Sequence, residues 1–135
     1  MTVLPRYRAN VASTEKCGRR MGDHRKLDVW KLGCILSDRV DVVVAGLPAR
    51  VRVGLGDQLS RAAESIHLNI AEGCGLNSDP QLAKHVRQSL GSANEVEDAL
   101  ARLHQRGLLK PQDHDLLNDA TVLRRKLGAF LKTLS

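Results

Sequence analysis

Aromatic residues are scarce in this sequence, and the shortage narrows the choice of fold. One Trp, one Tyr and one Phe make up 2% of the 135 residues, so a core must be built from Leu, Val, Ile and Ala. Leu and Ala favour helices, whereas the aromatic residues that favour strands are few. Hydrophobic residues still reach 42%, which suffices for one core in a chain of this length. We therefore expect a single all-α domain.

Cysteines and long apolar runs are also few. Cys17, Cys34 and Cys74 are odd in number, widely spaced and without a C-x-x-C pair, which does not indicate a disulfide framework or a zinc site. We expect reduced thiols and a cytoplasmic location. No run of about 18 apolar residues is present, and the N-terminus has no apolar signal region. The sequence thus predicts neither a membrane span nor a secretory signal.

Positive charge is concentrated at the N-terminus. Residues 1–26 hold seven basic and two acidic side chains, so they carry +5 of the net charge of +6. The basic residues are Arg6, Arg8, Lys16, Arg19, Arg20, Arg25 and Lys26. Residues 1–22 lack a sustained apolar period and contain Pro5 and two glycines, which predicts a flexible arm before a domain at 23–135. Such an arm could bind phosphate backbones without sequence preference, or serve as a solvated tail.

Apolar residues recur at steps of three or four in four segments, which predicts four amphipathic helices. The expected helices span residues 23–46, 57–72, 79–106 and 111–135. Gly and Pro predict connectors at residues 48–56 and 73–79. Short connections between such helices are typical of an antiparallel up-down-up-down four-helix bundle.

The first helix has an apolar surface wider than one stripe. Leu27, Trp30, Cys34 and Ile35 lie beside or off the stripe that Val29 begins. A helix on the surface of a monomer needs only one such stripe. The excess predicts burial against a second subunit.

Two further residues attract attention in the second and third helices. Gly91 stands in the middle of a helix, where it costs about 1 kcal/mol relative to Ala, and such a glycine usually indicates close helix contact. Asn69 lies three residues from Ile66, on the side expected to be buried. A buried amide must be hydrogen-bonded, so we expect Asn69 to join its helix to the third helix or to the following loop.

Motifs for catalysis or metal binding are not found. Glu64-x-x-His67 resembles half of a di-iron site, but a second E-x-x-H is missing. Glu95, Glu97 and Asp98 are expected to form a solvated acidic face rather than an acid–base pair. We expect no catalytic residues, no metal and no cofactor, and hence not an enzyme.

Three segments together resemble one family. They are residues 25–30 (RKLDVW), 58–73 (QLSRAAESIHLNIAEG) and 90–97 (LGSANEVE). They are similar to the proteins encoded by intervening sequences inside bacterial 23S ribosomal RNA genes. The motif residues to which we assign a structural role are Trp30, Gln58, Arg61, Asn69, Glu72, Gly73, Gly91, Ser92 and Glu95.

The resemblance implies a four-helix bundle that assembles as a ring, often a homopentamer. A relative of this family, the accessory variability protein of diversity-generating retroelements, forms a basic pentamer that works with a reverse transcriptase and nucleic acid. This chain departs from the family after residue 73, because residues 74–79 lack Lys and Arg. Leu82 and Val86 also stand where Phe is common.

The leading hypothesis is a non-enzymatic oligomeric scaffold that associates with RNA, DNA or a nucleic-acid enzyme. Besides the arm, Arg25 and Lys26, its candidate nucleic-acid contacts are Arg50, Arg52, Arg61, Arg124, Arg125 and Lys126. The alternative is a protein–protein interaction module without a nucleic-acid role. A third reading, a small-molecule or metal site, depends on Glu64 and His67 alone.

Overall fold

The computed structural model describes residues 23–134. The arm predicted at residues 1–22, with Arg6, Arg8, Arg19 and Arg20, lies outside the described residues.

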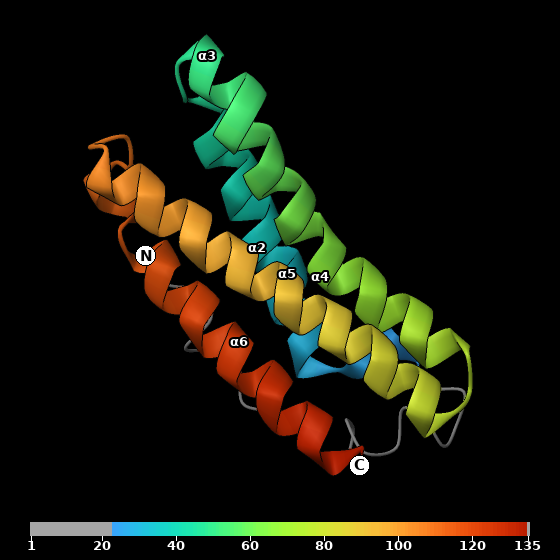
Figure 1. The fold of residues 1–135 in the computed structure, drawn as a ribbon. Helices are drawn as coiled ribbons and strands as arrows, with labels where there is room; N and C mark the ends of the chain where they lie inside the picture. The colour runs from blue at the N-terminus through green and yellow to red at the C-terminus, as the bar shows by residue number, and fades with distance from the viewer. Residues whose placement is uncertain (1–22, 135) are drawn as a thin grey trace.

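Four long helices account for most of the described chain (Figure 1). They are α2 (Asp28–Ala45), α4 (Asp57–Gly75), α5 (Asp79–Gln105) and α6 (Asp115–Thr133). The short helical turns are η2 (His24–Lys26), α3 (Ala49–Val51), the π-helical η3 (Arg52–Gly56) and η4 (Pro111–Asp113). The described residues contain no strand, so the all-α prediction is confirmed.

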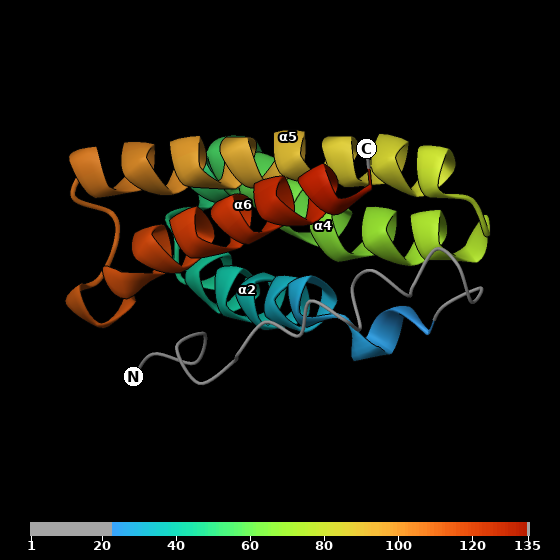
Figure 2. The ribbon, with the colours of Figure 1, turned by 90° about the horizontal axis from the view of Figure 1, so that it is seen from below.

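Each long helix packs against two others: α2 against α4, α4 against α5, α5 against α6, and α6 against α2 (Figure 2). The fully buried large side chains come from all four helices and include Leu32, Leu36, Leu59, Ile66, Ile70, Leu82, Leu100, Leu103, Leu116, Leu123 and Leu127. They form one core, as expected for a four-helix bundle. No helix within residues 23–134 has both the length and the apolar character to cross a membrane.

The chain is helical from Ala49 to Gly56, so the connector predicted at residues 48–56 is wrong. The backbone of Pro48 is extended, and its carbonyl accepts two N–H groups at 2.9 Å, which starts the helix. α3 and η3 then lead directly into α4. A Cβ atom on Gly56 would lie 3.2 Å from Val44 Cγ1, so this glycine permits close contact with α2 rather than a turn.

The boundaries of α5 agree with the sequence prediction, whereas α4 continues to Gly75, beyond its predicted end at Glu72. Ser78 caps α5, because its Oγ accepts the backbone N–H of Gln81 at 3.2 Å. Gly107 follows α5 with φ +70°, a backbone conformation that favours glycine.

The contact between α4 and α5 is close at Gly73. A Cβ atom there would lie 2.8 Å from His85 Cβ and 3.3 Å from Leu82 Cα. One turn further into the bundle, the buried Ser89 hydroxyl donates to the Ile66 carbonyl at 2.8 Å. The absence of a side chain at Gly73 therefore sets the separation of the two helices.

Gly91 does not mark such a contact, and that interpretation of the sequence is wrong. Gly91 is exposed, and a Cβ atom on it would meet nothing within 4 Å. The periodicity of the helix explains why Gly91 is exposed and not at a helix contact. Gly91 lies on the outer face of α5, whereas the next residue, Ser92, is buried.

Arg39 joins α2 to α6 through three carboxylates. Its guanidinium lies 2.8 Å from Asp115, 2.9 Å from Asp119 and 3.8 Å from Asp113. Asp119 is 1% exposed, and its Oδ1 has no hydrogen-bond partner among the described residues. Burial and the charge of Asp115 raise the pKa of Asp119, whereas the hydrogen bonds from Arg39 lower the pKa of Asp115.

Substitution by alanine should change the free energy of unfolding in opposite directions at Gly73 of α4 and at Gly91 of α5. Gly73→Ala is expected to lower the free energy of unfolding by about 1–3 kcal/mol, because the new methyl group must displace neighbouring atoms. Gly91→Ala, the matched control, is expected to raise it by about 0.5–1 kcal/mol, because Ala is the better helix former. Urea denaturation followed by circular dichroism measures both. Equal effects of the two substitutions would contradict this packing.

Arg39→Leu should leave Asp119 buried without a cation. We expect the free energy of unfolding to fall by about 3 kcal/mol near neutral pH, the lower end for a broken buried pair, since Arg39 is partly exposed. The loss should shrink in mild acid, because protonation of Asp119 removes the uncompensated charge. Arg87→Leu, which removes an exposed Arg from α5, is the control. A loss independent of pH would rule out this role for Arg39.

Candidate functional site

An open polar groove runs along the outer face of α4; its larger hollow is lined by α4 alone and its smaller hollow by α4 and α5. Two adjoining hollows, of about 260 and 200 Å³, share Arg61 and Ser65 and together make up this groove. Six of the predicted motif residues line it: Gln58, Arg61, Asn69 and Glu72 from α4, and Ser92 and Glu95 from α5. Segments separated by about 20 or more residues in the sequence therefore converge on one surface of the protein.

The floor of the groove is a hydrogen-bond network between the two helices. Asn69 Nδ2 donates to the Ser65 carbonyl at 3.0 Å and to Ser65 Oγ at 2.9 Å. Asn69 Oδ1 lies 3.1 Å from His85 Nδ1, which is therefore the donor of that bond. Ser92 Oγ donates to Ser65 Oγ at 2.9 Å. Asn69 thus joins α4 to α5, and these small polar groups fix how the helices pack.

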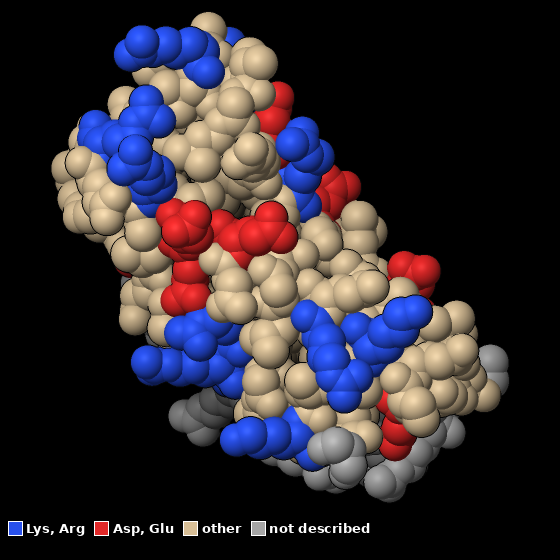
Figure 3. Space-filling model, viewed as in Figure 1, with Lys and Arg blue, Asp and Glu red and all other residues tan. Residues whose placement is uncertain are grey.

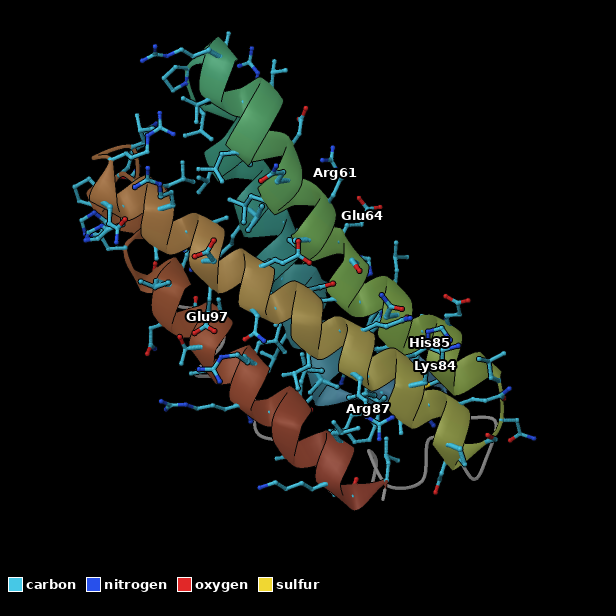
Figure 4. All side chains as sticks on the ribbon, viewed as in Figure 1. Arg61, Glu64, Lys84, His85, Arg87 and Glu97 are labelled. Atoms are coloured by element: carbon cyan, nitrogen blue, oxygen red, sulfur yellow. The ribbon has the colours of Figure 1, made fainter. Side chains whose placement is uncertain are left out.

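The rim of the groove differs from its floor. The side chains of Gln58, Arg61, Glu64 and Glu95 make no hydrogen bond or ion pair with other described residues, and Figure 4 shows Arg61 and Glu64 on the outer side of α4. Leu68 lies between Glu64 and Glu72 on α4 and is 52% exposed. A structural role within the monomer therefore explains Asn69 and Ser92 but does not explain the rim.

Glu72 is near the groove's end and mostly exposed. Its Oε2 lies 3.8 Å from His85 Nδ1. The motif residue Trp30, on α2, does not line the groove; it is half-buried and packs edge-to-face against His24 at 5.2 Å.

The predicted nucleic-acid contacts do not gather on one surface. Arg50 and Arg52 are exposed near one end of the bundle, on α3 and η3, while Arg61 stands among the acidic residues of the groove. Arg125 is exposed and Lys126 half-buried on α6. On the face seen in Figure 3, Lys and Arg fall into separate groups with acidic residues between them.

Two of the residues predicted to contact nucleic acid already form ion pairs within the protein. Arg25 pairs with Asp23 at 2.9 Å, whereas the neighbouring Lys26 is exposed. Arg124 pairs with Glu97, which also accepts the hydroxyl of Thr121. Arg124 is therefore better explained as a link between α5 and α6 than as a phosphate contact.

Sequence reasoning missed a basic pair on α5. Lys84 and Arg87 are exposed, and neither side chain has a carboxylate within ion-pair distance among the described residues (Figure 4). They lie three positions apart, so they share a helix face, opposite the buried Leu82 and Val86. That spacing was the signal that could have identified them.

Glu97 does not have the properties of a general acid. Burial acts to raise the pKa of Glu97, but hydrogen bonds from Thr121 and Arg124 outweigh it and hold the pKa below its usual value. Glu97 is therefore ionised and engaged at neutral pH, while Glu95 and Asp98 are exposed. This carboxylate group offers no raised pKa that would suit proton donation.

Metal-binding side chains and thiols are the remaining candidates for reactive chemistry. Within residues 23–134 no three His, Cys, Asp or Glu side chains are placed to hold a metal ion, and Glu64 faces the groove without a third ligand. Cys34 is a free thiol whose pKa is raised by burial and by Asp38. Cys74 is fully buried in α4.

Comparison with known proteins gives one match. A family model described as 23S rRNA-intervening sequence protein matches residues 25–129, and no curated protein matches the chain. The matched segment contains α2, α4, α5 and most of α6, including every residue that lines the groove. Since the match covers well over half of the chain, this protein belongs to the family of 23S rRNA-intervening sequence proteins.

Proposed function

We propose that this protein is a non-catalytic helical scaffold that assembles into a ring of identical subunits, with a pentamer favoured, and associates with RNA, DNA or a nucleic-acid enzyme. The observation that carries the nucleic-acid role is the net charge of +5 on residues 1–26, to which exposed basic residues of the bundle add. Arg50, Lys84, Arg87 and Arg125 are exposed and have no carboxylate at ion-pair distance among the described residues. A ring would multiply this charge around a single particle, which raises its attraction for phosphate backbones.

We also propose that successive helices of the bundle run antiparallel, in up-down-up-down order. The contacts between α4 and α5 support this order. Gly73 lies against Leu82, whereas Ser65 bonds to Ser92, so residue numbers fall along α4 as they rise along α5. Such a bundle displays its four outer faces to partners.

Exposed apolar side chains support assembly. Val42 is 72% exposed and Val53 is 71% exposed. Trp30 and Ile35 are only partly buried, whereas Leu27 is fully buried within its own subunit. The wide apolar surface predicted for α2 is therefore partly used by the monomer, and the remainder is available to a second copy.

A protein–protein interaction module without a nucleic-acid role is the second candidate. The groove favours it, because its rim combines Arg61 with Glu64, Glu72 and Glu95. A rim of mixed charge with a predominance of acids repels a phosphate backbone and suits a protein surface.

Binding of the oligomer to RNA and DNA across a salt series tests the nucleic-acid role. We expect micromolar binding that weakens steeply as salt rises, and loss of binding when residues 1–21 are deleted, since those residues hold five basic side chains and one acid. Fluorescence anisotropy measures the affinity. Circular dichroism verifies that the truncated protein keeps its helices.

The matched control retains the arm. A full-length variant with Arg106→Glu and Lys110→Glu, two exposed positions outside the predicted contacts, lowers the net charge by the same four units and should still bind. Failure of the full chain to bind even at low salt would remove the nucleic-acid role and leave the protein-interaction module.

A further inference from the structure

The charges on the surface are segregated between two faces of the same subunit. The groove rim carries Glu64, Glu72 and Glu95 against Arg61. On α6, no acidic residue follows Asp119, and Asp119 itself is held by Arg39. The helix therefore has an acid-free second half with a basic outer face.

The outer face of α6 forms a ridge. Arg125, Ala129 and Lys132 are exposed and follow one another at steps of four and three, which places them in one line along the helix. At 1.5 Å per residue, the two basic positions are about 10 Å apart, with a small apolar side chain between them.

The groove carries the complementary pattern. Glu64, Leu68 and Glu72 follow one another at steps of four on α4, so the two acids are about 12 Å apart. The half-exposed Leu68 lies between them, as Ala129 lies between the two basic residues. Long basic side chains easily absorb a difference of about 2 Å in spacing.

We propose that the α6 ridge of one subunit docks along the α4 side of the groove of a second copy, with Arg125 and Lys132 facing Glu64 and Glu72, and Ala129 against Leu68. Charge complementarity favours this occupant over a two-fold dimer, in which each face would meet itself and repel. α4 and α6 are not neighbours in the bundle, so every subunit presents both faces at once (Figures 1 and 2).

A contact between two different faces is heterologous, and repetition of it closes into a ring when the rotation permits. The inference rests on the oligomeric part of the proposed function and specifies its interface. It also reassigns Arg125 from a candidate nucleic-acid contact to a subunit contact.

Two full-length variants test the proposal. Glu64→Lys with Glu72→Lys reverses the groove, and Arg125→Glu with Lys132→Glu reverses the ridge. All four side chains are exposed, so neither variant should disturb the core. Each variant alone should lose the oligomer in sedimentation velocity at concentrations where the unchanged protein is assembled, because like charges then meet at the contact.

An equimolar mixture of the two variants should associate again, into heterodimers and assemblies in which the two variants alternate. A five-membered ring cannot alternate them throughout, so recovery is measured as association of the two variants and not as return of the original ring. The intact ridge of the groove variant meets the intact groove of its partner, and the two reversed faces attract each other. Recovery in the mixture also establishes that both variants are folded. Asp98→Lys with Gln105→Lys and Gln112→Lys raises the net charge by the same four units as the groove variant, outside the groove, the ridge and helix α2, and should remain assembled.

The outcomes separate this inference from the proposed function. If the protein without substitutions is a monomer, both the proposed ring and its proposed interface are wrong. If the unchanged protein assembles, but the reversed variants also assemble or the mixture does not recover, only the proposed interface is wrong. A ridge variant that stays assembled and loses RNA binding would assign the ridge to nucleic acid and overturn the proposal.

Discussion

The close approach of α4 and α5 is the constraint on which the rest of the structure depends. At Gly73 the two helices are so near that a single methyl group would collide with His85. The same approach brings the Ser89 hydroxyl to the Ile66 carbonyl and Asn69 to His85. A groove with a fixed polar floor exists only because these backbones are held together, since wider spacing would break each of these short hydrogen bonds.

The opposite side of the bundle is held by different chemistry. Arg39 gathers Asp113, Asp115 and Asp119 at the contact between α2 and α6. Glu97 joins α5 to α6 through Thr121 and Arg124. Charges used in this way are not available to partners. The charges that remain unpaired, such as Arg61 and Glu95 in the groove and Arg125 on α6, are therefore the more informative ones about assembly and binding.

Most of the fold could be predicted from the sequence. The errors in that prediction have local causes. Apolar periodicity identified all four helices, because burial of one stripe is a property of the local sequence. The connector at residues 48–56 was mispredicted because Gly56 allows contact with Val44 rather than a turn, whereas Gly54 is open to solvent within a helical turn. Gly73 and Gly91 are indistinguishable by residue type, and yet one is enclosed and the other is open. The candidate site was predicted as a set of motif residues, but not as a groove.

The sequence by itself determined the helical class, the approximate helix boundaries, the family and the concentration of basic residues near the N-terminus. These properties follow from composition, from spacing along one chain and from motif order. Only the tertiary structure decided which residues meet across helices: that Gln58, Arg61, Ser92 and Glu95 share one groove, that Arg124 is neutralised, and that Lys84 and Arg87 are not. The physical reason is that helix packing sets the rotation and register of each helix against its neighbours, which local spacing does not encode.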